Sequence, residues 1–152
     1  MRRTIVLGGI AVVAVLVVTS LASGRPSQKV GSVTKFSATI NAGQVVPHPK
    51  GTQAGASGQF TATLTGTTLK WTLAYAHLSG PATAAHIHWG ARGKNGIALV
   101  ALCPPCKSPL RGAATAVTDD VAALMAGGKT YVNVHTARNE EGEIRGQIRV
   151  AH

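Results

Sequence analysis

Three histidines in two short segments carry the clearest chemistry of this sequence. His86 and His88 flank a single isoleucine, and His135 lies in the run 131–136 near the other end of the chain. Side chains alternate between the two faces of a β-strand, so His86 and His88 point the same way if their segment is extended. If this strand pairs with a second strand that carries His135, the three imidazoles come together. Three such nitrogens are a ligand set for copper or zinc, and we predict a metal site here.

The choice of metal follows from the donor types. Calcium and magnesium prefer oxygen ligands, and no carboxylate accompanies these histidines in sequence. Copper is slightly favoured over zinc because it heads the affinity order for nitrogen donors. The alternative interpretation has no metal: the three imidazoles form hydrogen bonds to carbonyl groups across strands and hold the fold closed.

Three further polar residues are candidates for supporting roles. His48 stands between two prolines in a loop, and His77 follows the apolar face of residues 69–75, so each is a possible additional ligand. Each is alternatively an exposed or end-of-strand residue. Asn133 shares a strand face with His135 and could orient an imidazole through a hydrogen bond. A buried amide that pairs with backbone groups is the alternative for Asn133.

Two cysteines, Cys103 and Cys106, enclose a pair of prolines. In an oxidising compartment they would form a local disulfide that constrains a turn. The alternatives are redox-active or metal-binding thiolates, and inert thiols. A c-type haem would need a histidine after the second cysteine, where Lys107 stands.

Catalytic motifs are absent from the sequence. No serine lies in a nucleophile elbow, and the paired carboxylates at 119–120 and 140–141 fit a helix start and a turn. Glu143 and Arg145 should project from the same side of the last strand, where they form an ion pair or a solvated face. We therefore expect a binding protein rather than an enzyme.

Strand patterns recur along the chain. Apolar and polar residues alternate with period two, which is typical of strands with one buried and one wet face, over residues 36–40, 60–65, 69–75 and 143–150. Residues 66–68 fit a hairpin turn, and residues 97–102 fit a short buried strand. Trp71 is the expected anchor of a core that is otherwise poor in aromatic residues.

One segment departs from the strand pattern and favours a short helix near 119–126. Thr118 can cap its first turn, and Asp119 and Asp120 suit the positive end of the helix dipole. Gly127 can adopt the left-handed conformation that ends a helix. About seven or eight strands with one such helix predict an all-β, immunoglobulin-like or Greek-key antiparallel sandwich or barrel.

The N-terminus indicates export. A basic start, an apolar run from about residue 5 to 18 and small residues before position 23 predict a signal peptide over residues 1–22. An uncleaved N-terminal membrane anchor is the alternative. Residues 23–34 read as a linker, and residues 35–150 as one β domain. The expected location is secreted or extracytoplasmic.

The charge is strongly and unevenly basic. The net charge is +10, and residues 23–118 contain no Asp or Glu. Such a surface attracts anions, including acidic lipid headgroups and polysaccharides. Nucleic acid is not expected as a partner, because the chain is exported and lacks clustered aromatic residues for base stacking. The oligomeric state is left open.

Several motifs in order resemble the chordin-type (CHRD) domain over residues 35–150. They are the segments 84–90, 95–96, 124–128, 131–136 and 142–148. The resemblance implies an extracellular, immunoglobulin-like β domain, and it brings no established catalytic residues. Trp89-Gly90-Ala91 departs from the Gly-Pro pair that is common after His88 in this family.

A second, weaker similarity is to copper/zinc superoxide dismutase, in which a His-x-His pair and a later histidine bind copper. His86, His88 and His135 match in type, but a bridging histidine and a zinc-binding aspartate have no counterpart. Our first hypothesis is therefore a CHRD-like binding module that holds one copper or zinc ion. The alternatives are a copper-dependent redox enzyme and a metal-free structural or adhesive module that binds anionic polymers.

Overall fold

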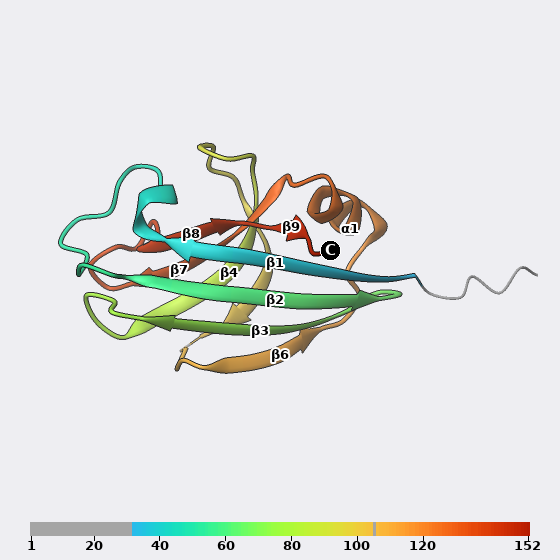
Figure 1. Cartoon of the computed structure of the whole chain (residues 1–152), viewed down its shortest axis with the longest axis horizontal. Helices are drawn as coiled ribbons and strands as arrows, with labels where there is room; N and C mark the ends of the chain where they lie inside the picture. The colour runs from blue at the N-terminus through green and yellow to red at the C-terminus, as the bar shows by residue number, and fades with distance from the viewer. Residues whose placement is uncertain (1–31, 105) are drawn as a thin grey trace, which may run out of the picture.

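The computed structural model describes residues 32–104 and 106–152 (Figure 1). Within this part of the chain about half of the residues lie in strands, with one short α-helix and one 3-10 turn. The elements are β1 (Val33–Asn41), η1 (Ala42–Gln44), β2 (Ser57–Thr65), β3 (Thr68–Ala76), β4 (Ala82–Trp89), β5 (Ala98–Cys103), β6 (Leu110–Ala114), α1 (Asp119–Ala126), β7 (Thr130–Thr136), β8 (Ile144–Gln147) and β9 (Arg149–Val150).

The strands pair antiparallel in the order β5-β4-β7-β8-β1-β2-β3-β6, and β9 also pairs with β1. In Figure 1, β1, β2, β3 and β6 form a front layer, with β4 and β7 behind them. The two end strands β5 and β6 contact each other, so the sheet curls into a nearly closed barrel. The predicted all-β antiparallel fold with one short helix is confirmed.

Alternation of side chains builds the core between the layers. Phe36, Phe60 and Trp71 from β1, β2 and β3 are buried, while the threonines and lysines between such residues face outward. β2 and β3 form the predicted hairpin, in which Gly66 takes a left-handed φ of 56°. The Trp71 ring packs against Gly112 of β6, where a Cβ would come within 2.5 Å of the ring, so only glycine fits.

The helix α1 covers the predicted residues 119–126. The Thr118 hydroxyl accepts a hydrogen bond from the Val121 N–H at 3.3 Å, as a capping side chain should. The prediction for the helix end was wrong by one residue. Gly127 has an ordinary φ of −76°, and Gly128 takes the left-handed conformation at 64°.

Two strand predictions need correction. Residues 97–102 do not form a buried strand: β5 is an end strand of the sheet, and Ile97 just before it is 70% exposed. Sequence reasoning also missed β6, because its residues Leu-Arg-Gly-Ala-Ala show no alternation of large apolar and polar side chains.

The last predicted strand is interrupted, and of the side chains on its predicted wet face only Arg149 is exposed. It divides into β8 and β9, and Glu143, Arg145 and Gln147 are buried. The proposed solvated face is therefore wrong. No ion pair forms between Glu143 and Arg145 either, because the two side chains have different partners, as described below.

The N-terminal predictions mostly lie outside the described residues. This holds for the signal peptide or anchor at 1–22 and for the linker up to residue 31, whereas Val33 and Thr34 belong to β1. Among residues 32–104 and 106–152, no helix has the length and apolar character that a membrane crossing requires.

Glu143, just before β8, joins two loops through its buried carboxylate. Oε1 accepts from the Ser79 N–H at 2.6 Å, and Oε2 accepts from the Ser79 hydroxyl at 2.7 Å and the Thr136 hydroxyl at 2.6 Å. Burial by itself raises the pKa of Glu143, but these hydrogen bonds together outweigh burial and lower the pKa below its ordinary value.

We predict that Glu143→Gln lowers the free energy of unfolding by about 2–3 kcal/mol, because an amide cannot accept from all three donors. A lowered folded-state pKa stabilises the fold above the ordinary glutamate pKa of about 4.3, and this contribution is lost as pH falls through the folded pKa. The free energy of unfolding should therefore fall less steeply with decreasing pH in the variant than in the wild type. Urea unfolding between pH 7 and pH 3 measures both effects.

The matched control is Glu140→Gln, which makes the same change at an exposed glutamate of the same loop. Its unfolding curves should follow those of the wild type. A similar loss of stability in both variants would contradict a special role for the Glu143 carboxylate.

Candidate metal centre

The antiparallel pairing of β4 with β7 places the three histidines on one face. His88 lies opposite Tyr131, His86 opposite Asn133, and Ala84 opposite His135, so His135 is the diagonal neighbour of His86. The residues between them, such as Ile87 and Val134, point into the core. Period-two alternation on two neighbouring strands thus produces the predicted convergence.

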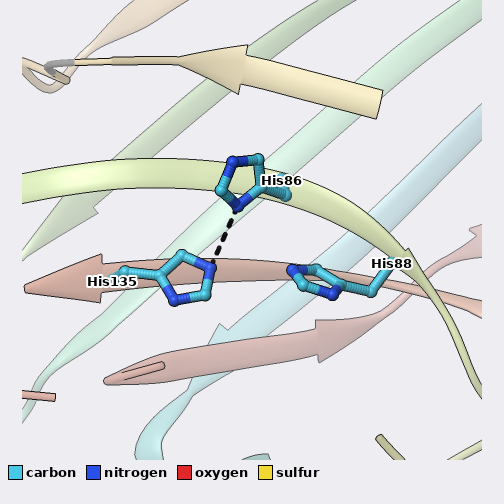
Figure 2. A group of neighbouring side chains, drawn as sticks. All are labelled: His86, His88 and His135. Carbon is cyan, nitrogen blue, oxygen red and sulfur yellow. Dashed lines mark hydrogen bonds between the residues drawn. The ribbon is translucent and has the colours of Figure 1, made fainter. Parts of the chain in front are cut away.

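Figure 2 shows the three imidazoles facing a common space between β4 and β7. Nδ1 of His86 lies 3.2 Å from Nε2 of His135. One potential ligand atom from each of the three histidines lies within 4.8 Å of the others. Nitrogens about 2.0–2.1 Å from one tetrahedral ion are about 3.3 Å apart, so modest ring rotations would bring the three to a single ion.

Backbone carbonyl groups fix the orientation of two of the rings. Nδ1 of His88 lies 3.0 Å from the Gly96 oxygen, and Nδ1 of His135 lies 2.7 Å from the Glu140 oxygen. A carbonyl oxygen only accepts, so each Nδ1 must carry the proton and donate. The lone pair is then on Nε2 in both rings, and Nε2 of His88 is buried without a hydrogen-bond partner. These are the properties of two pre-oriented ligands.

Burial keeps the imidazoles in their neutral form. It is the main cause that lowers the pKa of His86, His88 and His135 below the ordinary value of 6.5. The bonds to the Gly96 and Glu140 carbonyls oppose this lowering for His88 and His135 but do not cancel it. Neutral imidazole is the form that binds a metal ion.

The histidines open onto a pocket of about 360 Å³ that their own strands and two loops line. One loop joins β4 to β5 and contributes Asn95 and Gly96, and the other joins β7 to β8 and contributes Glu140 and Glu141. An ion held by three nitrogens would therefore keep a coordination position that faces this pocket.

Asn133 lies on the face of the histidines, as predicted, and also lines the pocket. Its Nδ2 donates to the Glu141 oxygen at 2.8 Å, which matches the alternative of a buried amide paired with backbone. Its Oδ1 is buried with no partner. The amide packs on Gly142, where a Cβ would come within 2.2 Å of Asn133 Oδ1, and thereby holds the loop that presents the Glu140 carbonyl to His135.

Sequence reasoning missed a stack of three side chains that supports His88. The His88 ring lies parallel to Tyr131, with centroids 5.1 Å apart and planes 11° apart. The Arg145 guanidinium lies on the Tyr131 ring, 3.5 Å from its centroid. The alternation of Tyr131, Asn133 and His135 along the sequence was the available indication that Tyr131 belongs to this face.

Arg145 is 2% exposed and has no carboxylate partner. It donates instead to the side chain of Asn95 at 3.0 Å and to the carbonyls of Ala91 and Lys94 at 3.0 and 2.8 Å. These bonds hold the β4–β5 loop over the sheet, and the same loop supplies the Gly96 carbonyl that orients His88.

The remaining candidate residues lie apart from the cluster. His48 is exposed and faces its neighbouring Pro49 carbonyl, and His77 is an exposed residue with φ of 59° just beyond β3. Neither belongs to the three-histidine group. The structure thus provides no support for either as a further ligand.

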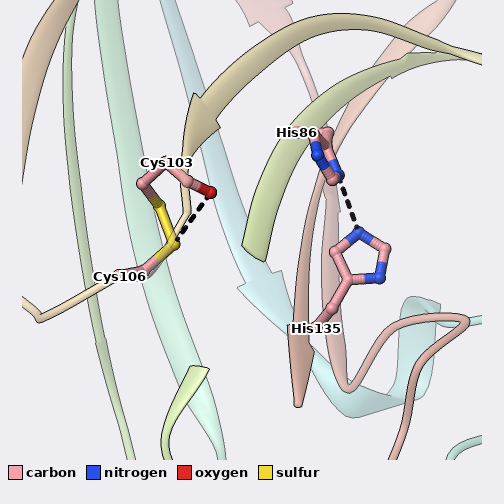
Figure 3. The surroundings of a disulfide bond; sticks show 4 residues. All are labelled: His86, Cys103, Cys106 and His135. Atoms are coloured by element: carbon pink, nitrogen blue, oxygen red, sulfur yellow. Dashed lines mark hydrogen bonds between the residues drawn. A yellow bond between two sulfur atoms is a disulfide. The ribbon is translucent and has the colours of Figure 1, made fainter. Parts of the chain in front are cut away.

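Cys103 and Cys106 form the predicted disulfide, which closes the turn after β5. Figure 3 shows it beside β4, the strand that carries His86. Cys103 lies opposite Ala85 in the β4–β5 pairing, and the Cys106 N–H donates to the Ala82 carbonyl at 3.4 Å, so both cysteines lie next to the histidine strand. In this state neither sulfur is a thiolate that could bind a metal ion.

Comparison with known proteins identifies one family. The family model of the CHRD domain matches residues 36–148, a span that includes all three histidines and both loops of the pocket. Neither the curated proteins nor the solved structures contain a match to this chain.

We predict that metal-free protein at pH 7 has His88 and His135 neutral and protonated on Nδ1, because each Nδ1 donates to a carbonyl group. Long-range ¹⁵N–¹H spectra of the imidazole rings distinguish this tautomer from the one protonated on Nε2. Since the pKa of both rings is lowered from 6.5, each ring should reach half-conversion to imidazolium at a pH below 6.5. An Nε2-protonated ring at either position would contradict the proposed ligand orientation.

Proposed function

The chain belongs to the CHRD family, and we propose that its β-sandwich is a binding module that holds one copper or zinc ion through His86, His88 and His135. The proposed ligand atoms are Nε2 of His88, Nε2 of His135 and Nδ1 of His86. In the metal-free protein the Nδ1–H of His86 donates to Nε2 of His135, so on metal binding this proton would move to Nε2 of His86. The N-terminal sequence supports an extracytoplasmic location for this module, as a secreted or membrane-anchored protein.

The observation that carries the proposal is the unpartnered Nε2 of His88 beside the close pair of His86 and His135. If the histidines served only to cross-link the backbone, hydrogen bonds to carbonyl groups would satisfy all of their ring nitrogens. Those bonds use one nitrogen of His88 and one of His135, and the other nitrogens turn toward the shared space. A buried polar atom without a partner is costly, and a metal ion would satisfy it.

The donor set favours copper or zinc over other metals. Three neutral nitrogens suit borderline ions and not calcium or magnesium. Glu140 and Glu141 line the same pocket but do not belong to the group of three potential ligands. Copper has the higher affinity for such ligands, so we propose copper as the preferred ion in direct competition. His88 and His135 would bind with little ordering cost, since hydrogen bonds already orient them.

We predict one bound ion per chain after full-length protein without a polyhistidine tag is dialysed against copper or zinc. His86→Ala/His135→Ala should weaken binding about 100-fold or more, because it removes two of the three ligands. Metal analysis by mass spectrometry and a copper EPR spectrum with nitrogen couplings provide the measurements. Metal at saturation should also raise the unfolding temperature of the wild type.

The matched control is His48→Ala/His77→Ala, which removes two exposed histidines and should leave the stoichiometry unchanged. Equal metal content in both double variants, or a wild type without metal, would reject the site.

A second candidate function, copper-dependent redox activity such as superoxide removal, is favoured by the pocket onto which the cluster opens. A bound copper ion that changes oxidation state would need such an accessible position. The cluster lacks the bridging histidine and aspartate of the dismutases, so this candidate ranks below simple metal binding. We predict that copper-loaded protein removes superoxide no faster than an equal concentration of free copper; a clearly faster rate would favour the enzyme.

A further inference from the structure

A second hollow lies on the outer face of the front layer, on strands other than β4 and β7, which carry the histidines. It has a volume of about 560 Å³ and is lined by residues of β1, β2, β3 and β6. None of the three histidines contributes to it. The four strands are neighbours in the sheet, so this hollow runs across them as a groove.

The strand registers arrange the groove side chains in two rows. One row is Ser37, Thr61, Thr72 and Arg111, and Arg149 of β9 extends it beyond Ser37. The other row is Lys35, Thr63, Lys70 and Ala113. Paired strands are about 4.8 Å apart, so hydroxyl-bearing residues fill the regular intervals between the cations.

The cations of the groove have no acidic neighbours on this face. Lys35, Lys70 and Arg111, which line the groove, are exposed, and so is Arg149 beside it. The five acidic residues of the chain lie at the start of α1 and at positions 140–143, outside the groove strands. The positive charges therefore add to one another and remain available to an external anion.

The hydroxyl groups between these cations are also available. In the described part of the chain, Ser37, Thr61 and Thr72 make no side-chain hydrogen bond to another protein group. A hydroxyl both donates and accepts, which matches the hydroxyl groups of a sugar. The groove thus combines groups that bind anions with groups that bind alcohols.

We propose that this groove binds an acidic polysaccharide that lies across β1, β2, β3 and β6. Its carboxylate or sulfate groups pair with the lysine and arginine side chains, and its hydroxyl groups bond to the serine and threonine side chains. The site is independent of the metal ion proposed above, because the two share no residue.

Other anionic partners fit the groove less well. A membrane surface favours exposed apolar side chains that insert between lipids. Among residues 32–104 and 106–152 the exposed large apolar residues are Val33, Val46, Trp89 and Ile97, and none of them lines the groove. Single-stranded nucleic acid favours exposed aromatic rings for stacking, and Trp71 is only 7% exposed.

The test measures binding of the full chain to polygalacturonate by calorimetry at low and high salt, with dextran as the uncharged probe. We expect binding to polygalacturonate that salt weakens, and none to dextran. Lys70→Gln/Arg111→Gln should weaken binding about tenfold, since it removes two contacts of exposed charges. Arg92→Gln/Lys94→Gln removes the same charge from an exposed loop outside the groove and should leave binding unchanged.

Equal weakening by both double variants would overturn the site, because attraction would then depend on net charge alone. Thr61→Val/Thr72→Val keeps all charges and should also weaken binding; unchanged affinity would overturn the polysaccharide as occupant. Tighter binding to phosphatidylglycerol vesicles or polyphosphate than to polygalacturonate would also overturn the polysaccharide as occupant.

Two further variants keep the test decisive. Lys35→Gln/Arg149→Gln repeats the charge test from the other edge of the groove if the first variant fails to fold. His86→Ala/His135→Ala should retain full polysaccharide binding. The groove and the metal site are thereby tested independently of each other.

Discussion

The register of β4 against β7 is the constraint on which the histidine site depends. It sets His86 opposite Asn133 and diagonal to His135, although His86 and His135 are 49 residues apart in sequence. The inward residues between them are apolar and fully buried. A slip of one residue would turn the histidines into the core and Ile87 and Val134 out of it. Core packing therefore holds the ligand geometry, and a metal ion is not needed to create it.

The outer side of this strand pair is polar and still mostly buried. Two loops cover it, and a cation without a counter-charge, Arg145, holds one of them in place. Burial of an unpaired charge is expensive unless strong acceptors replace water. For the Arg145 guanidinium these acceptors are two carbonyl oxygens, the amide oxygen of Asn95 and the face of the Tyr131 ring. The same covering lowers the pKa of the histidines and so keeps them neutral at the pH where a metal ion would bind.

This covering explains how far the sequence could predict the structure. Period-two alternation was enough to place His86 and His88 on one face, and Thr118 was enough to place the start of the helix. The same alternation made Arg145 and Gln147 look solvent-facing, because a binary pattern reports polarity and not the presence of a loop above a strand. Which carbonyls orient the imidazoles was equally beyond the pattern, since it depends on the course of loops 90–97 and 137–143.

Polar and apolar residues alternate with period two on both sides of the fold, but the polar side chains are covered on one side and exposed on the other. On β4 and β7, alternating polar residues are covered by loops, and dehydration turns them into oriented, neutral donors. On β1, β2 and β3, alternating polar residues remain in water, so the lysine and threonine side chains of the groove stay accessible to a partner. Dehydrated imidazoles suit a small ion that gives up its own water, whereas hydrated cations suit a long polymer held by many weak contacts. The loops cover the polar side chains of β4 and β7 but not those of β1, β2 and β3, and this difference determines which kind of ligand each set of strands can bind.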